Sequence, residues 1–268
     1  MAETVELAQN GAVAELTINR PEALNALNGE VLLGISQHLK YIRTSPELFK
    51  TIRALVIRGS GERAFVAGAD IKLMHNAAID PAKRAELSSF IELGQQVMRQ
   101  IEDLPLPVLA EIQGFAIGGG LELALACDLI VASDKAQLGQ AEVNLGLIPG
   151  FGGTQRLRRR IGSGGAKRLI LTGESVSAAE AYRLGLVDWL VSAAELSTTT
   201  AKICRSITEK SPIAIGAAKR LVDADWMQSR NQLLQAEIDG FLQTFETADA
   251  REGIAAFVEK RKSVFPGR

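Results

Sequence analysis

The residues with the clearest capacity for chemistry are two glutamates twenty positions apart, Glu122 and Glu142, each beside glycine-rich backbone. Three consecutive glycines, 118–120, precede the first glutamate, and the stretch 150–153 follows the second. Three glycines after a strand allow the backbone to approach a ligand closely and to turn into a helix. The first N–H groups of that helix have no intrahelical partner, and with the helix dipole they attract negative charge.

Two carboxylates and exposed N–H groups together suit proton transfer next to a polarised carbonyl, such as the developing enolate oxygen of a thioester. Donors arranged in advance around such an oxygen are typically worth ~3–4 kcal/mol each in the transition state. We expect Glu122 in the first helical turn and Glu142 in a loop after a short strand, with both facing one cavity. The alternative is a structural role, because the helix dipole alone favours a glutamate in a first turn.

Alternating strands and helices must position these groups. A hairpin is expected to turn at Asn10–Gly11, and most later strands are apolar on both sides, as in sheets covered on both faces. The predicted strands are 5–7, 12–18, 54–58, 108–112, 128–132 and 136–138, and the predicted helices are 28–42, 81–103, 120–126, one after 153, one from 212, 230–244 and 249–262. This is an α/β pattern of repeated strand–strand–helix units, purely helical after about residue 205. We therefore expect a core with the active site at 1–200 and a helical region at 201–268.

Composition restricts the class of protein. The chain has 268 residues, 47% hydrophobic and 23% charged, so it can bury a sizeable core. Its net charge of −1 does not indicate a partner such as nucleic acid or an anionic membrane. No apolar run approaches the ~18–20 residues of a membrane span, and the first residues lack the features of a signal peptide. Cys127 and Cys204 are predicted to be buried free thiols. We therefore expect a cytoplasmic protein. No metal site is expected, since His38 and His75 are the only histidines.

Other signals receive plainer interpretations. The basic cluster at 156–160 is expected to form a solvated helix face or inter-subunit ion pairs, with phosphate or RNA contact as the alternative. The segment 162–167 is predicted to be a turn between helices. Asp70 is expected to cap a helix or shape a loop, and Phe257 and Trp189 to lie in the core.

The run 116–156 resembles the signature of the crotonase (enoyl-CoA hydratase) superfamily. The segments 67–72, 19–27 and 257–262 are similar to that superfamily as well, in the same order, so the resemblance extends from about residue 12 to the end. It implies a crotonase-like spiral of ββα units followed by a C-terminal helical trimerisation region. It also implies a homotrimer or a dimer of trimers.

The resemblance assigns roles by position. It implies an oxyanion hole formed by the backbone N–H groups of Ala69 and Gly119, with Glu122 and Glu142 as the catalytic pair. The residues implied to contact the substrate and its CoA are Ala23, Leu24, Ala67, Gly68, Asp70, Ile71, Lys72 and Lys260, the last across a subunit boundary. One departure is Ala141, where the family often has proline.

The implied activity is a hydro-lyase of fatty-acid metabolism that adds water to a trans-2-enoyl-CoA and gives a 3-hydroxyacyl-CoA. Glu122 takes the proton of the attacking water, and Glu142 enters protonated and delivers a proton to Cα. No cofactor is expected, because CoA is part of the substrate. The alternatives are a Δ3,Δ2-enoyl-CoA isomerase, a branched-substrate hydratase of the 3-methylglutaconyl-CoA type, and a non-catalytic acyl-CoA-binding or RNA-binding oligomer.

Overall fold

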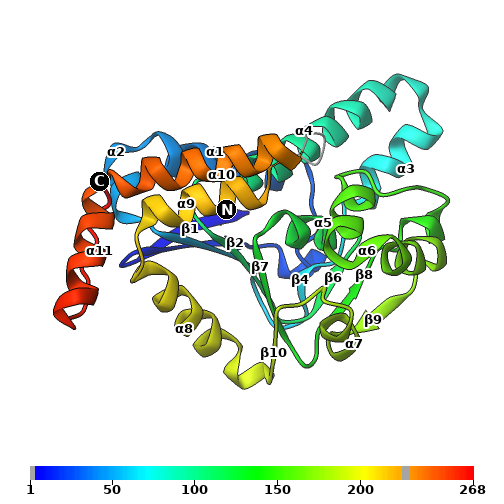
Figure 1. The fold of residues 1–268 in the computed structure, drawn as a ribbon. Coiled ribbons are helices and arrows are strands. Elements are labelled where there is room, and N and C mark those ends of the chain that lie inside the picture. The colour runs from blue at the N-terminus through cyan, green and yellow to red at the C-terminus, as the bar shows by residue number, and fades with distance from the viewer. Residues whose placement is uncertain (1–3, 225–229) are drawn as a thin grey trace.

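The computed structural model describes residues 4–224 and 230–268, which form two sheets surrounded by helices (Figure 1). The strands of the larger sheet, in spatial order, are β1 (Val5–Asn10), β2 (Val13–Ile18), β3 (Ala54–Gly59), β5 (Val108–Ile112), β7 (Leu129–Ser133) and β10 (Trp189–Val191). Those of the smaller sheet are β4 (Ala64–Val66), β6 (Phe115–Ile117), β8 (Gln137–Gly139) and β9 (Ser175–Ser177). The pairs β3/β4, β5/β6 and β7/β8 each contribute one strand to either sheet, so the chain advances as a spiral of repeated units.

The larger sheet begins with the expected antiparallel hairpin, and from β2 onward its neighbouring strands are parallel. Every residue of β5 is buried, and β3 is buried except at one position. Strands buried on both faces are typical of a parallel sheet covered by helices. The predicted apolar strands are therefore confirmed as the centre of the fold.

The helices of the main body cover the sheets. They are α1 (Gly29–Thr44), α2 (Pro46–Thr51), α3 (Ile71–Ile79), α4 (Arg84–Glu102), α5 (Gly119–Ala126), α6 (Gly153–Thr172) and α7 (Ala178–Arg183). Asn28 caps α1 as expected, its side chain accepting the N–H of Val31 at 2.9 Å. Helix α5 is buried on all sides, as expected of a helix that is apolar all round, and Glu122 is its only charged residue.

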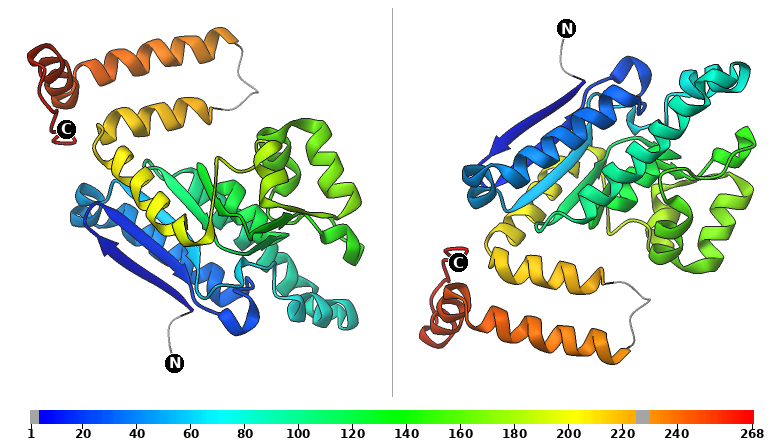
Figure 2. Two further views of the ribbon diagram at one scale, coloured as in Figure 1. Left: turned by 90° about the horizontal axis from the view of Figure 1, so that it is seen from below. Right: turned by 90° about the horizontal axis from the view of Figure 1, so that it is seen from above.

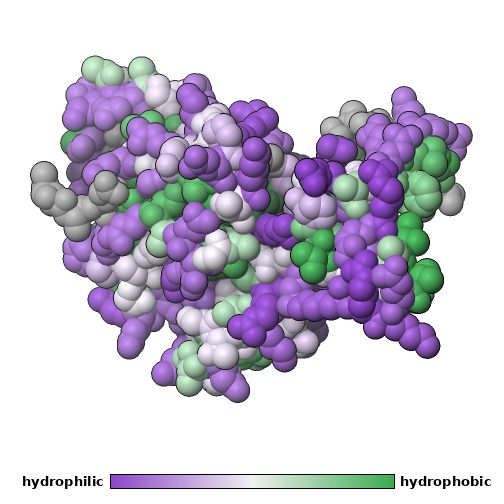
Figure 3. All heavy atoms as spheres, turned by 90° about the vertical axis from the view of Figure 1, so that its left-hand side faces the viewer, coloured by the Kyte–Doolittle hydropathy of each residue, from purple (hydrophilic) through white to green (hydrophobic). Residues whose placement is uncertain are grey.

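Within residues 196–224 and 230–268 lie the helices α8 (Leu196–Thr208), α9 (Pro212–Val222), α10 (Arg230–Phe245) and α11 (Ala248–Glu259). Helices α10 and α11 extend away from the sheets (Figure 2). Hydrophobic residues are visible on the surface of this extension (Figure 3), and the exposed ones are Leu234, Ile238, Phe241, Leu242, Phe245, Ile254, Phe257 and Val258. The expected boundary at residue 200 lies inside α8, and the division into two parts stays a prediction.

Two core assignments were wrong. Phe257 is 86% exposed, because α11 lies on the extension where little of the chain covers it, and Trp189 is 37% exposed, on the edge strand β10. The strand β4 was not among the predicted strands. The turn predicted at 162–167 is limited to Gly162, whose φ is 74°. Cys127 and Cys204 are buried free thiols, as predicted. Across the described ranges, no helix is both long enough and apolar enough to cross a membrane.

Candidate functional site

The N-terminus of α5 forms the centre of the site, and its glycines are required by close contacts. A Cβ at Gly120 would lie 1.9 Å from the carbonyl oxygen of Val66 in β4, so only glycine allows this approach. Gly118 has φ 53° and ψ −121°, and its N–H donates to the carbonyl of Gly139 at 2.8 Å. These contacts place the start of α5 against both β4 and β8.

The N–H groups of Ala69 and Gly119 come together beside this turn. The N–H of Leu27 donates to the carbonyl of Gly68 (2.9 Å), and the N–H of Asp70 donates to the carbonyl of Leu27 (2.7 Å). Because the bonding direction alternates along extended backbone, the N–H of Ala69 faces away from Leu27. The Cβ position of Gly119 lies 3.4 Å from that nitrogen. In the described part of the chain, neither N–H group donates to a protein acceptor.

Glu122 lies one turn into α5 and is 1% exposed. Its Oε1 accepts the N–H groups of Phe151 at 2.8 Å and of Gly153 at 2.7 Å. Burial raises the pKa of Glu122 from 4.5 to about 7, these two N–H groups oppose the change, and the charge of Glu142 adds to it. The carboxyl group is therefore able to take up and release a proton near neutral pH.

Glu142 begins the short 3-10 helix Glu142–Leu145 directly after β8, and its carboxylate lies against the α5 turn. Its Oε1 accepts the Nε2 of Gln140 at 2.8 Å, and a Cβ at Gly118 would lie 3.1 Å from the same oxygen. Burial raises the pKa of Glu142, and the bond from Gln140 opposes this. Its Oε2 is buried without a hydrogen-bond partner among the described residues. This atom is therefore free to contact a substrate or water.

The preceding residue, Ala141, has φ −101° and ψ 10°. Proline holds φ near −65°, so the loop has a conformation that proline would have to change. With alanine at position 141, where the family often has proline, the carboxylate of Glu142 still lies against the α5 turn.

Phe151 supports the site and was not singled out in the sequence. Its ring contacts that of Phe90 edge-on, with centroids 5.5 Å apart. A Cβ at Gly119 would lie 3.2 Å from the Phe151 ring, and one at Gly94 would lie 2.2 Å from it. Its ring thus fills the space between α4 and the start of α5, while its N–H binds Glu122. The sequence alone does not reveal this role, because the segment 149–153 (PGFGG) is typical of any glycine-rich loop.

Several of the residues expected to contact CoA lie together. The N–H of Ala67 donates to the carbonyl of Leu24 at 3.1 Å, which brings the loop containing Ala23 and Leu24 against the Ala67–Asp70 segment. Asp70 caps α3 by accepting the N–H of Lys72 at 3.2 Å, as its helix-cap interpretation predicted, and it pairs with Arg20 at 3.3 Å.

Two further CoA candidates, Ile71 and Lys72, are exposed at the start of α3. Lys260 follows α11, at the opposite end of the molecule from α3 (Figure 1). One chain therefore does not bring Lys260 to the site, and its contact across a subunit boundary stays a prediction.

The basic cluster on α6 was only partly described by the solvated-face interpretation. Arg158 and Arg159 are exposed. Arg156 instead pairs with Glu102 at 2.5 Å and is 10% exposed, and Arg160 pairs with Asp188 at 2.5 Å. These two arginines join elements of one chain, which corrects the expectation of solvated or inter-subunit charges.

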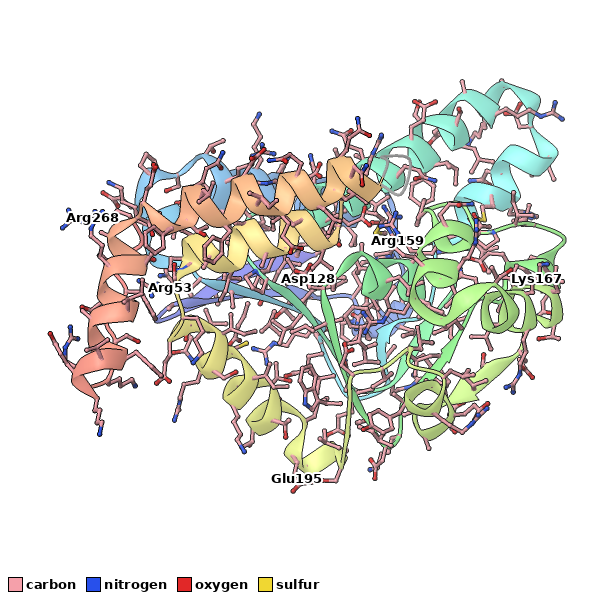
Figure 4. The ribbon with its side chains drawn as sticks, viewed as in Figure 1. Arg53, Asp128, Arg159, Lys167, Glu195 and Arg268 are labelled. Carbon is pink, nitrogen blue, oxygen red and sulfur yellow. The ribbon has the colours of Figure 1, made fainter. Side chains whose placement is uncertain are left out.

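Two hollows open on the surface of the protein. One, of about 300 Å³, is lined by Asn28, Gly29, Asp70, Glu86, Ser89, Phe90 and Leu93, next to the Ala67–Asp70 segment. The other, of about 770 Å³, is lined by residues of α9 and α10 and by residues just before β3. Its lining includes Arg53 and Arg268, which are labelled in Figure 4. None of the residues that line the second hollow belongs to the glutamate site. Over 4–224 and 230–268, no three His, Cys, Asp or Glu side chains are grouped as a metal site requires.

Residues 8–268 match the enoyl-CoA hydratase/isomerase family. The chain is 41% identical over 263 residues to a crotonyl-CoA hydratase of Syntrophomonas wolfei, covering 98% of both chains. It is 41% identical over 258 residues to a short-chain-enoyl-CoA hydratase of Clostridium acetobutylicum, covering 96% of this chain and 95% of the relative. The crystal structure of an enoyl-CoA hydratase from Bacillus anthracis is similar with a TM-score of 0.92 at 35% identity, covering 99% and 100% of the two chains. The fold and the sequence together show that this chain belongs to the enoyl-CoA hydratase/isomerase family, within the crotonase superfamily that its motifs indicated.

Proposed function

We propose that the protein hydrates short-chain trans-2-enoyl-CoA thioesters, such as crotonyl-CoA, to 3-hydroxyacyl-CoA. The observation that carries the proposal is the pair Glu122 and Glu142, one buried and one partly buried carboxyl group at one helix N-terminus, where the charge of Glu142 acts on Glu122. The two relatives named as hydratases of crotonyl-CoA and short-chain enoyl-CoA support this substrate class.

The thioester oxygen is proposed to bind between the N–H groups of Ala69 and Gly119. Their proximity and their lack of acceptors in the described chain support this role. Two donors directed at the developing enolate oxygen withdraw electrons from the conjugated system, and Cβ becomes electrophilic. Removal of one such donor typically costs ~3–4 kcal/mol of transition-state stabilisation.

The two carboxyl groups are proposed to divide the proton transfers. Hydration needs one ionised group, which takes a proton from water as its oxygen bonds to Cβ, and one protonated group, which gives a proton to Cα. Two N–H bonds to Oε1 favour the ionised form of Glu122, which suits the base. The unpartnered Oε2 of Glu142 suits delivery of the Cα proton.

The pKa values bear on this division. Burial raises the pKa of both groups, and that of Glu122 reaches about 7 in the free protein. Because the pKa of Glu122 lies near neutral pH and the charge of Glu142 helps to raise it, the pair can hold one proton there, as a reaction with one acid and one base requires. Assigning that proton to Glu142 in the substrate complex is part of the proposal.

Substitution of either glutamate tests the function. Glu122→Gln and Glu142→Gln are each expected to reduce hydration of crotonyl-CoA about 10²–10⁴-fold, measured by loss of the enoyl absorbance, while acyl-CoA binding is retained in a calorimetric titration. Near-normal turnover in either variant would contradict the pair mechanism. Conversion of a 3-enoyl-CoA by a wild-type protein that does not hydrate crotonyl-CoA would favour the isomerase instead.

The remaining contacts and the assembly are also proposed. Ala23, Leu24, the 67–72 segment and Lys260 are proposed to bind the CoA portion, with CoA as part of the substrate and no separate cofactor. The exposed apolar side chains of α10 and α11 support assembly into a trimer or a dimer of trimers, which light scattering during size-exclusion chromatography would measure. Location in the cytoplasm stays a prediction.

A further inference from the structure

The guanidinium of Arg156, on the first turn of α6, is held by two elements of the fold. Its Nε and Nη2 donate to the two carboxylate oxygens of Glu102, at the end of α4, at 2.8 and 2.5 Å. Its Nη1 donates to the carbonyl of Phe151 at 2.7 Å. A bidentate arginine–carboxylate pair fixes direction as well as distance, so the third bond is aimed at one peptide group.

That peptide group lies in the turn that binds Glu122. The N–H groups of Phe151 and Gly153, on either side of it, both donate to Oε1 of Glu122. The guanidinium therefore holds the middle of a turn whose two ends hold the carboxylate. Gly152 has φ 103°, and a Cβ there would lie 2.2 Å from Nη1 of Arg156, so the glycine leaves the space that the arginine occupies.

Helix α4 holds the same turn at a second point. The Nε2 of Gln95 donates to the carbonyl of Gly150 at 2.8 Å. Gln95 and Glu102 lie seven positions apart, about two helical turns, on one face of α4. Contacts from one rigid helix at two points restrict the turn more strongly than its glycines would allow by themselves.

We infer that Arg156, anchored by Glu102, is a positioning residue that keeps the Phe151–Gly153 turn aligned on the carboxylate of Glu122. The inference rests on the proposed function, in which Glu122 takes the proton of the attacking water. Among the described residues, the charged side chains that act on Glu122 are Glu142 from the 3-10 helix and Arg156 from α6. Loss of Arg156 removes the cation and loosens both N–H donors, and both changes favour the protonated form of Glu122.

The same helix provides a matched control. Arg160 lies one turn further along α6, is partly buried, and pairs with Asp188 at 2.5 Å. It also donates to the carbonyls of Leu186 and Asp128, both at 3.3 Å. It has the same chemistry as Arg156 and makes no contact with the 151–153 turn, so Arg160→Gln reports the loss of a helix-docking ion pair alone.

The test compares Arg156→Gln, Arg156→Lys, Glu102→Gln and Arg160→Gln in hydration of crotonyl-CoA across pH. Arg156→Gln is expected to lower kcat about 10- to 100-fold, as a misplaced catalytic group does, and to move the acidic limb of the kcat profile to higher pH. Arg156→Lys and Glu102→Gln keep the cation but lose the bidentate anchor, so kcat falls while the acidic limb stays closer to that of the wild type. Arg160→Gln is expected to leave the acidic limb unchanged.

The inference is overturned if Arg156→Gln keeps the wild-type acidic limb and loses no more kcat than Arg160→Gln. If Arg156→Gln does not fold, the two variants that keep the cation decide: both must lose more kcat than Arg160→Gln. A wild-type protein inactive on crotonyl-CoA would contradict the proposed function instead. In that case the positioning role is tested by unfolding experiments instead of turnover. The free energy of unfolding depends on pH through Glu122, and in Arg156→Gln this dependence should continue to a higher pH than in the wild type.

Discussion

Replacement of Glu122 by glutamine should change how the stability of the protein depends on pH. The carboxyl group is 1% exposed, and burial raises its pKa from 4.5 to about 7. Glutamine keeps an oxygen that accepts the N–H groups of Phe151 and Gly153, and it removes the titrating group. The comparison of wild type and Glu122→Gln therefore isolates the free energy of ionising this buried site.

The sign and the size follow from linkage. Below pH 4.5 the group is protonated in both the folded and the unfolded chain, so its contribution to stability is fully present. As the pH rises from 4.5 to about 7, the unfolded chain loses the proton while the folded protein retains it. The free energy of unfolding thus falls by about 1.4 kcal/mol per pH unit, or about 3.4 kcal/mol in total, and is constant again above the folded pKa. About 2.5 kcal/mol of this loss lies between about pH 5 and about pH 8.

Urea unfolding at several pH values and one fixed protein concentration measures this effect. The stability of Glu122→Gln relative to wild type should increase by about 2.5 kcal/mol between about pH 5 and about pH 8. Glu62→Gln is the control, since Glu62 is exposed in the turn between β3 and β4, and its stability difference from wild type should not follow this course. A difference between Glu122→Gln and wild type that is constant across pH would refute the raised pKa and the burial argument behind it.

Three further predictions concern the same site. Glu142→Gln removes a negative charge that raises the pKa of Glu122, so the pH range of the stability loss should end at a lower pH in the same urea experiment. Gly94→Ala should lower the free energy of unfolding by about 1–3 kcal/mol, because its Cβ would lie 2.2 Å from the Phe151 ring. Gly164→Ala is the control in thermal unfolding, since nothing lies within 4 Å of its Cβ. Equal stability of the two variants would contradict the packing argument. Dialysis against a strong chelator should leave turnover of crotonyl-CoA unchanged, and a loss that added divalent metal restores would show that the mechanism lacks a component.

The candidate carboxylates were predictable because their local setting is encoded in nearby residues. A helix begins within the 118–120 glycines because glycine permits a positive φ and a close backbone contact, and Glu122 therefore falls in its first turn. The hairpin at Asn10–Gly11 and the apolar spacing of α4 are equally local. Of the three-residue strands, β8 was predicted, at 136–138, whereas β4 and β6 were not, since a segment so short carries little periodicity.

The burial of apolar residues was less predictable. Phe257 and Trp189 were placed in the core because their hydrophobicity is the same whether a side chain packs inside one chain or lies on an exposed face. Only the extension of α10 and α11 away from the sheets, and the edge position of β10, decided that both side chains are exposed.

By itself, the sequence determined which groups carry the proposed chemistry: two carboxylates, and glycine turns that present free N–H groups. Tertiary structure decided how these groups act. It placed the N–H of Ala69 beside Gly119, fifty positions later, and brought Glu102 from α4 to the turn that binds Glu122. It also raised the pKa of Glu122 to about 7, because that value depends on how much water and which charges surround the carboxyl group, and both are properties of the packed protein.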